Sequence, residues 1–177
     1  MSSTKSVKGH SNLESALTIV RTSIAELGQY DGAEAVLGKG ENLAIIGRAI
    51  FDLTVANNLQ FQAIGARGIY GEAVARAAML AGDSSWFSVR QKLKGRGTNS
   101  WTEGVRDLRN KDVIIVDAFG QADTLLVSEL VGRVVGANVV GILPVVDFDE
   151  GIGENAAALL PGIPYIPLIP KDMLAVA

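Results

Sequence analysis

One segment in the middle of the chain constrains the fold most, because an apolar run ends there in an acid. The run is Val113–Val116, the acid is Asp117, and a helical pattern begins at Thr124 after a short polar turn. A short apolar run bounded by turn signals is typical of a buried strand in a parallel sheet. The segment therefore predicts a strand that ends in a carboxylate, beside the free backbone N–H groups of a turn and a helix start.

Strands and helices are expected to alternate along the chain. The expected strands are 59–64, 85–89, 113–116, 138–146 and 165–169, and helices are expected at 42–56, 69–80, 124–135 and 154–160. This alternation predicts an α/β fold with a mainly parallel, twisted sheet flanked by helices. Ligands of such sheets bind at the carboxyl ends of the strands, where 65–68, 90–104, 117–124 and 147–151 should lie.

The N-terminal part is expected to add a further helix. Ser11 and Glu14 have the spacing of a capping box, so a helix is predicted to begin there and to end at Gly28, with Leu13, Leu17, Val20 and Ile24 buried. Residues 28–40 are expected to be a loop with a possible short strand at 35–37. We expect a flexible tail at residues 1–10 and a single domain at residues 11–177.

Composition excludes several classes of function. The net charge of -3 argues against a generic nucleic-acid-binding protein, which uses basic surface to displace counterions. The absence of cysteine excludes disulfides, thiol catalysis and cysteine-held metals, and a single histidine excludes a multi-histidine metal site. No apolar run approaches the roughly 20 residues of a membrane span. A cytoplasmic protein that binds no membrane is the default expectation.

Asp117 and the turn after it are the first candidate site. Asp117 can accept hydrogen bonds from ribose hydroxyls, and the backbone N–H groups of the turn with the Thr124 hydroxyl can bind a phosphate. The residues of this candidate phosphate loop are Gly120, Gln121, Ala122, Asp123 and Thr124. The alternative is an ordinary strand-to-helix turn in which Asp123 or Thr124 caps the helix.

Two other segments carry candidate anion-binding cations. Residues 90–104 have no helical or strand period and bear four cations with no acid between them: Arg90, Lys92, Lys94 and Arg96. They are compatible with a lid over an anion or with a solvated basic loop. Arg67 lies in a glycine-flanked turn, where it could bind phosphate oxygens or remain an ordinary surface arginine.

Taken together, these segments resemble the type I phosphoribosyltransferases, most closely the orotate phosphoribosyltransferases. The resemblance extends over roughly residues 59–169 and includes the Asp117 segment, the 136–147 segment, the basic loop from Val89 to Gly97, and Glu103-Gly104. It implies a small N-terminal hood and the transfer of a phosphoribosyl group from phosphoribosyl pyrophosphate to a nitrogenous base in pyrimidine or other nucleotide metabolism. It also implies a homodimer, and Mg²⁺ held mainly by substrate oxygens and water rather than by the protein.

The resemblance assigns roles to the candidate residues. Asp117 would position the ribose, and residues 120–124 would hold the 5-phosphate. Lys94 and Arg96 would act on the leaving pyrophosphate, with Arg90 as the first arginine of the same loop. Arg67 would assist at the pyrophosphate turn.

Three departures from the family pattern leave the substrate open. Ala118 replaces the second acid of the motif, the loop is about one residue short with Asp123 at a typical glycine position, and Phe148 replaces an arginine that helps the orotate enzymes hold the substrate carboxylate. The accepted base is therefore not assigned. The alternative is a non-catalytic sensor or regulator of the same fold that binds a nucleotide or phosphoribosyl pyrophosphate. A nucleic-acid-binding module that uses 90–96 and Trp101 is a third hypothesis, which the acidic net charge disfavours.

Overall fold

A five-stranded sheet forms the centre of the protein. The computed structural model describes residues 4–93, 100–149 and 151–174. In these residues the strand order is β3-β2-β1-β4-β5, and only β3 is antiparallel to its neighbour. The strands are β1 (Ala63–Ala66), β2 (Ser85–Val89), β3 (Thr102–Gly104), β4 (Asp112–Phe119) and β5 (Asn138–Val146). The predicted α/β fold with a mainly parallel sheet is confirmed.

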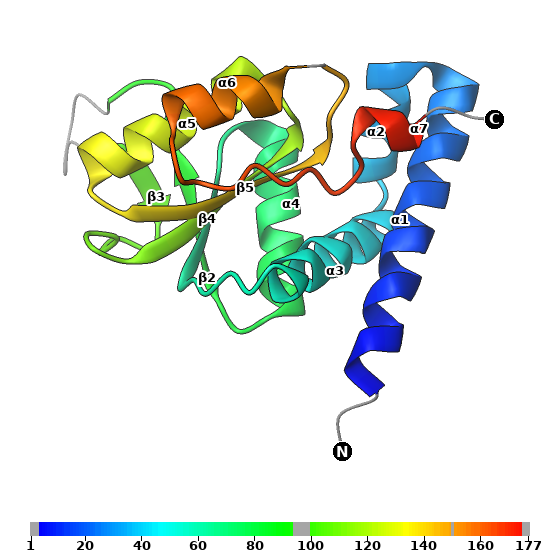
Figure 1. Ribbon diagram of the computed structural model, residues 1–177, viewed down its shortest axis with the longest axis horizontal. Helices are drawn as coiled ribbons and strands as arrows, with labels where there is room; N and C mark the ends of the chain where they lie inside the picture. Colours follow the sequence, from blue (N-terminus) through cyan, green and yellow to red (C-terminus); the bar gives the residue numbers. More distant parts are fainter. Residues whose placement is uncertain (1–3, 94–99, 150, 175–177) are drawn as a thin grey trace.

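Helices cover both faces of this sheet. Ile114 and Val116 of β4 belong to the core cluster that packs with α1–α4, whereas Val113 and Ile115 belong to the cluster under α5 and α6. This division follows from the two-residue period of a strand. Figure 1 shows α1, α2 and α7 gathered at one end of the molecule, away from α5, α6 and β3. The helices are α1 (Thr4–Leu27), α2 (Gln29–Leu37), α3 (Gly40–Ala56), α4 (Gly68–Ala81), α5 (Ala122–Leu130) continued by the π-helical turn Val131–Val135, α6 (Ile152–Leu159) and α7 (Lys171–Leu174).

Several predicted elements are confirmed and some boundaries move. Strands β2 and β5 have the predicted bounds, and α3, α4 and α6 lie within two residues of theirs. Strand β1 begins four residues later than expected, and β4 extends beyond the apolar run at both ends. The predicted helix 124–135 ends in π-helical geometry from Val131 onward.

The N-terminal predictions need two corrections. The capping box is wrong, because α1 begins at Thr4 and the Ser15 hydroxyl donates to the Ser11 carbonyl inside the helix (2.8 Å). The short strand at 35–37 is also wrong, because these residues belong to α2. A Cβ on Gly32 would lie 2.5 Å from the Ser23 carbonyl oxygen, so the backbones of α1 and α2 touch there and only glycine fits. The division into a tail at 1–10 and a domain at 11–177 stays a prediction.

The C-terminal strand prediction is wrong as a regular element. Residues 165–169 make only two isolated parallel bridges to β5, Ile142 with Tyr165 and Val146 with Ile169. Backbone hydrogen bonds still join residues 164–169 to β5, but Pro144 of β5 has no N–H to donate, which interrupts the regular ladder. The aperiodic stretch 90–104, in contrast, contains the edge strand β3.

None of the helices in the described part of the chain has the length and apolar character needed to cross a membrane.

Candidate functional site

Asp117 lies near the carboxyl end of β4, and the following turn folds around its carboxylate. Its Oδ1 accepts a hydrogen bond from the Ala118 N–H (2.7 Å), and its Oδ2 accepts one from the Thr124 hydroxyl (2.8 Å). The Thr124 hydroxyl also lies 3.2 Å from the Phe119 carbonyl oxygen. Thr124 is buried, so the acid and the first turn of α5 are held in one fixed arrangement.

Burial controls the charge of this acid. Removal from water raises the pKa of Asp117 to about 6, although the hydrogen bonds from Thr124 and Ala118 lower it, and the nearby charge of Asp123 raises it further. Desolvation dominates because it penalises the charged form. At neutral pH the group is a carboxylate, which can accept further hydrogen bonds from hydroxyl groups.

The start of α5 is not capped by a side chain. Gln121 occupies the N-cap position without a side-chain hydrogen bond, so the alternative in which Asp123 or Thr124 caps the helix is wrong. Gln121, Ala122 and Asp123 are exposed, whereas Gly120 is buried and its N–H donates to the Val146 carbonyl (2.8 Å). The exposed N-terminal turn of α5 therefore offers helix-end N–H groups to an anion.

Arg67 joins this turn from the neighbouring strand. It occupies the N-cap position of α4, directly after β1, and its Nη1 lies 3.1 Å from Asp123 Oδ1. The arginine is 17% exposed and Asp123 59%, so the pair opens to solvent on the aspartate side. Among the described residues, Arg67 Nε is buried without a partner. A cation with unused donor capacity therefore lies beside the candidate phosphate loop.

A second buried acid, which sequence reasoning did not assign, follows β5. Asp147 is 7% exposed; it accepts the Tyr165 hydroxyl (3.0 Å) and the Asp149 N–H (3.1 Å). A Cβ on Gly120 would overlap that hydroxyl, so glycine is required where the turn passes under Tyr165. Burial and the charge of Asp147 raise the pKa of Tyr165, which keeps its hydroxyl a donor. The sequence feature that could have indicated this contact is Gly120, at the start of the turn.

Three aromatic rings meet next to these acids. Ring centroids are 5.0 Å apart for Tyr30 and Phe148, 5.5 Å for Tyr30 and Phe119, and 5.9 Å for Phe119 and Phe148. Phe148 is buried, as expected for a core aromatic, whereas Phe119 is partly exposed and Tyr30 is 46% exposed. Tyr30, from α2, was not a candidate in the sequence.

Comparisons by sequence and by structure found similar proteins. No protein-family model matches the chain. It is 28% identical over 150 residues to the orotate phosphoribosyltransferase of Pyrococcus horikoshii, covering 85% of this chain and 80% of that protein. It is 26% identical over 161 residues to the Streptomyces coelicolor orotate phosphoribosyltransferase, covering 88% and 87%.

The solved structures agree on the fold. The Mycobacterium tuberculosis orotate phosphoribosyltransferase in complex with phosphoribosyl pyrophosphate has a TM-score of 0.75 at 24% identity, covering 93% of this chain and 92% of that one. A Corynebacterium diphtheriae phosphoribosyltransferase has a TM-score of 0.77 at 24% identity, covering 94% and 99%. The chain has the type I phosphoribosyltransferase fold.

The basic loop of this phosphoribosyltransferase fold is described only in part. Arg90 follows β2; its side chain forms an ion pair with Glu103, and its N–H donates to the Trp101 carbonyl (2.9 Å). Lys92 is exposed. Lys94 and Arg96 lie outside the described residues, so their predicted roles stay predictions. Arg90 is engaged at the base of the loop.

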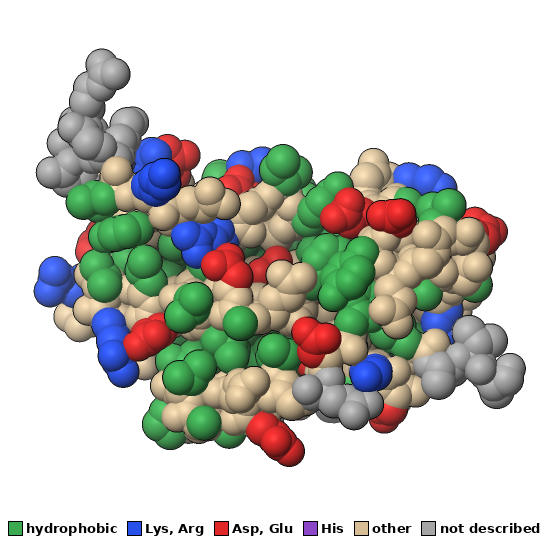
Figure 2. All heavy atoms as spheres, turned by 90° about the horizontal axis from the view of Figure 1, so that it is seen from above, with side chains coloured by type: hydrophobic (Ala, Val, Ile, Leu, Met, Phe, Trp, Pro, Cys, Tyr) green, Lys and Arg blue, Asp and Glu red, His purple; other side chains and the backbone are tan. Residues whose placement is uncertain are grey.

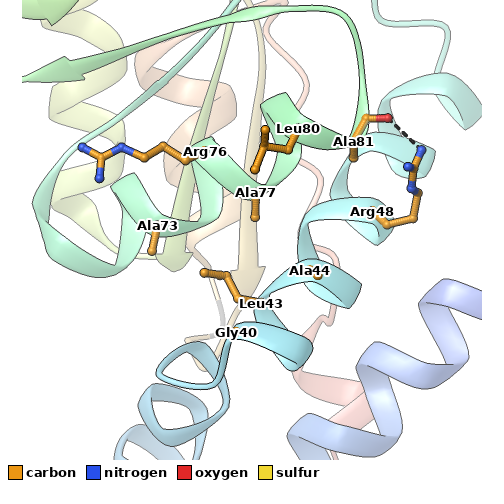
Figure 3. Close-up of a pocket in the computed structure, with 9 residues that line it drawn as sticks. All are labelled: Gly40, Leu43, Ala44, Arg48, Ala73, Arg76, Ala77, Leu80 and Ala81. Carbon is orange, nitrogen blue, oxygen red and sulfur yellow. Dashed lines mark hydrogen bonds between the residues drawn. The ribbon is translucent and has the colours of Figure 1, made fainter.

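Two pockets in the described residues contain none of the candidate site residues. One, of about 420 Å³, lies between α3 and α4, and Figure 3 shows it lined by alanine and leucine side chains together with Arg48 and Arg76. The Arg48 Nη1 donates to the Ala81 carbonyl (2.7 Å). The other, of about 340 Å³, lies beside Trp101 and Arg106. Neither pocket contributes to the chemistry at the ends of β4 and β5.

Proposed function

We propose that the protein is a phosphoribosyltransferase of pyrimidine nucleotide synthesis. It would join a nitrogenous base to phosphoribosyl pyrophosphate and release pyrophosphate. The observation that carries this proposal is the carboxylate of Asp117, held by Thr124 beside an uncapped helix start and Arg67. The orotate phosphoribosyltransferases among its relatives, matched along most of their length, support it.

Asp117 positions the sugar in this proposal. A carboxylate has about four lone-pair sites, and the two hydrogen bonds from Ala118 and Thr124 leave capacity for ribose hydroxyls. Because these contacts fix the carboxylate before ligand binds, little side-chain entropy is lost on binding. The acid works in its charged form, above its pKa of about 6.

The 5-phosphate binds at the start of α5. The exposed residues Gln121, Ala122 and Asp123 present the first turn of the helix, whose N–H groups and dipole favour an anion. Arg67 faces Asp123 and offsets the unfavourable charge that this aspartate brings to the turn. A phosphate entering there would compete with Asp123 for the guanidinium.

Mg²⁺ fits this site as an ion carried by the substrate. Among the described residues, no group of three or more His, Cys, Asp or Glu side chains could hold a metal. In our proposal phosphate oxygens and water occupy most coordination positions of the ion, as is usual for Mg²⁺, and Asp117 is the one carboxylate that we assign to it. When bound, the ion would neutralise charge on the departing pyrophosphate.

Lys94 and Arg96 would stabilise the leaving group, with Arg90 supporting their loop. Cations at this point match a transition state in which an oxocarbenium-like sugar separates from pyrophosphate. We also propose a cytoplasmic homodimer in which this loop reaches the neighbouring subunit's site.

One observation favours a second candidate function, a non-catalytic sensor that binds a nucleotide or phosphoribosyl pyrophosphate. Ala118 replaces one of the two acids of the motif. A single acid can still accept hydrogen bonds from ribose hydroxyls, so this change weakens catalysis more than it weakens recognition of a ribose phosphate.

Pyrophosphate release tests the two candidates directly. The protein is incubated with phosphoribosyl pyrophosphate, Mg²⁺ and a panel of bases that includes orotate. Turnover with any base, lost in Lys94→Ala and kept in the matched control Lys92→Ala, supports the enzyme. Thermal stabilisation by phosphoribosyl pyrophosphate without turnover supports the sensor, because a ligand at about 100 times its Kd stabilises by about 2.7 kcal/mol. If the protein shows neither turnover nor stabilisation, both candidate functions are rejected.

A further inference from the structure

The three aromatic rings lie where a base on an anchored ribose would extend. Phe119 lies two residues beyond Asp117 on β4 and packs against the core cluster on the α1–α4 side of the sheet. Two residues of strand span about 6.6 Å, which is comparable to the step from a sugar to its attached base. Phe148 follows the end of β5 by two residues, and Tyr30 reaches the same point from α2.

The rings leave one side open. Phe148 is 7% exposed and fills the interior, whereas Tyr30 is 46% exposed and Phe119 is partly exposed. Tyr30 meets the other two rings edge to face, at 63° and 73°. An edge-to-face arrangement leaves part of the tyrosine face free for another flat ring. The open side is therefore an aromatic surface rather than a polar one.

The charges around these rings are negative. Asp117, Asp147 and Asp149 all lie close enough to Tyr165 to raise the pKa of its hydroxyl, and Asp31 follows Tyr30. The ion pairs within the described residues involve none of these four acids. Figure 2 shows acidic side chains distributed among apolar and basic ones across one face of the molecule. A ligand group with negative charge would be repelled here.

We infer that Tyr30 and Phe119, backed by the buried ring of Phe148, form the base-binding surface, and that it selects a planar base without a carboxylate over a carboxylated one. The inference rests on the proposed function and names its substrate class. The rings offer stacking, which is available to any flat base, and their own side chains carry no positive charge that could pair with a carboxylate. A carboxylate placed against them would lose its water and meet like charges at short range, which costs more in a partly buried site than in solution.

Binding of three ligands that share a ribose phosphate tests the inference. Calorimetry compares ribose 5-phosphate, which carries no base, with uridine 5′-monophosphate, which carries an uncharged base. The third ligand is orotidine 5′-monophosphate, which carries a carboxylated base. We expect the uridine nucleotide to bind roughly ten-fold tighter than ribose 5-phosphate, from stacking. We expect the orotidine nucleotide to bind at least ten-fold more weakly than the uridine nucleotide.

The outcomes separate the inference from the proposed function. If ribose 5-phosphate binds and the orotidine nucleotide binds as tightly as the uridine nucleotide, the inference is overturned and the proposed function stands. If none of the three binds, both are overturned.

Substitutions at Tyr30 test the role of the rings at an exposed position that tolerates change. Tyr30→Ala should remove most of the uridine advantage and leave ribose 5-phosphate binding unchanged. The matched control Leu27→Ala removes a similarly exposed apolar side chain and should change neither affinity. Tyr30→Arg should narrow or reverse the preference against the orotidine nucleotide. Equal losses in Tyr30→Ala and Leu27→Ala, or an unchanged preference in Tyr30→Arg, would overturn the inference.

Discussion

The ends of β4 and β5 lie side by side in the sheet but are built in different ways. Asp117 of β4 pairs in register with Pro144 of β5, and Phe119 pairs with Val146. Around Asp117 the contacts come from the next seven residues of the same segment. Around Asp147 they come from Tyr165, and around Phe148 from Tyr30, both distant in sequence.

This difference matches two kinds of ligand group. A local turn supplies backbone N–H groups and one oriented hydroxyl, which suit hydroxyls and phosphate. Distant aromatic residues supply flat apolar surface, which suits a base. The comparison suggests that the sugar-phosphate half of the site is encoded in one stretch of sequence, whereas the base half depends on how α2 and the C-terminal segment pack.

The largest expected effect is at the end of β4. Asp117→Asn keeps the size of the side chain but removes the charge, and its amide would face either the Thr124 hydroxyl or the Ala118 N–H. We expect the Kd for ribose 5-phosphate to rise roughly 10- to 150-fold, since hydrogen bonds to a charged group contribute roughly 1.5–3 kcal/mol. Calorimetry measures the change, with Asp83→Asn, at an exposed acid in a distant loop, as the control. An unchanged Kd would place the ribose elsewhere.

The contact between Gly120 and the Tyr165 hydroxyl joins the two strand ends, and one added methyl group there should lower the unfolding free energy. Gly120→Ala puts a Cβ into the Tyr165 hydroxyl, and overpacking of this kind typically costs about 1–3 kcal/mol of unfolding free energy. Tyr165→Phe removes the hydroxyl and leaves Asp147 without that donor, at a cost of about 1–3 kcal/mol.

Urea denaturation of the double variant sharpens this test. Because the two changes act on the same contact, the combined loss should be smaller than the sum of the single losses. Gly153→Ala in α6 is the matched control, because its Cβ would lie 3.7 Å from the Tyr165 ring, an ordinary contact. Strict additivity would show that the two strand ends are not coupled through Tyr165.

The pH dependence of binding should follow the β4 acid. As pH falls through about 6, Asp117 takes up a proton and loses its charged acceptor oxygens, so ribose 5-phosphate binding weakens by up to about ten-fold per pH unit. The ligand phosphate titrates in a similar range, so the informative quantity is the ratio of Kd between Asp117→Asn and wild type. That ratio should shrink from about pH 8 to about pH 5. A ratio that stays constant would exclude Asp117 as the titrating group.

The smallest expected effect is at the exposed ion pair beside the phosphate loop. Asp123→Asn frees Arg67 and should tighten phosphate binding roughly two- to five-fold, whereas Arg67→Gln should weaken it by a similar factor. Neither should change the unfolding free energy by more than about 1 kcal/mol, because the aspartate is exposed.

Titration with inorganic phosphate measures both changes. Glu129→Gln, which breaks the ion pair with Arg133 further along the same helix, is the control. Changes of the same sign in Asp123→Asn and Arg67→Gln would show that the pair acts only through the local structure.

Much of the sheet could be predicted because its signals are local. Strands β2 and β5 are apolar segments bounded by turn residues, and their bounds were predicted correctly. Helix α2 was not predicted because Gly32 is a weak helix former in the sequence. In the fold, the same glycine lets the backbone of α2 touch the backbone of α1. Pro144 of β5, which has no N–H to donate, interrupts the ladder between β5 and the last apolar segment.

The candidate site, like the sheet, could be predicted only in part. Asp117 and the turn to Thr124 could be located from one segment, although the hydrogen bond between them could not. The pairing of Arg67 with Asp123 joins residues 56 positions apart, and no local pattern reveals it. Lys94 and Arg96 stay predictions.

By itself the sequence determined most of the strands and helices and which strand carries an acid near its end, because these properties depend on neighbouring side chains and their period. Only the tertiary structure decided what surrounds that acid. Arg67 of the β1 turn, the Tyr165 hydroxyl and the Tyr30 ring come from segments that are 48 to 87 positions away from Asp117 in the sequence. Their meeting depends on the packing of the helices on the sheet, which has no signature within any one of those segments.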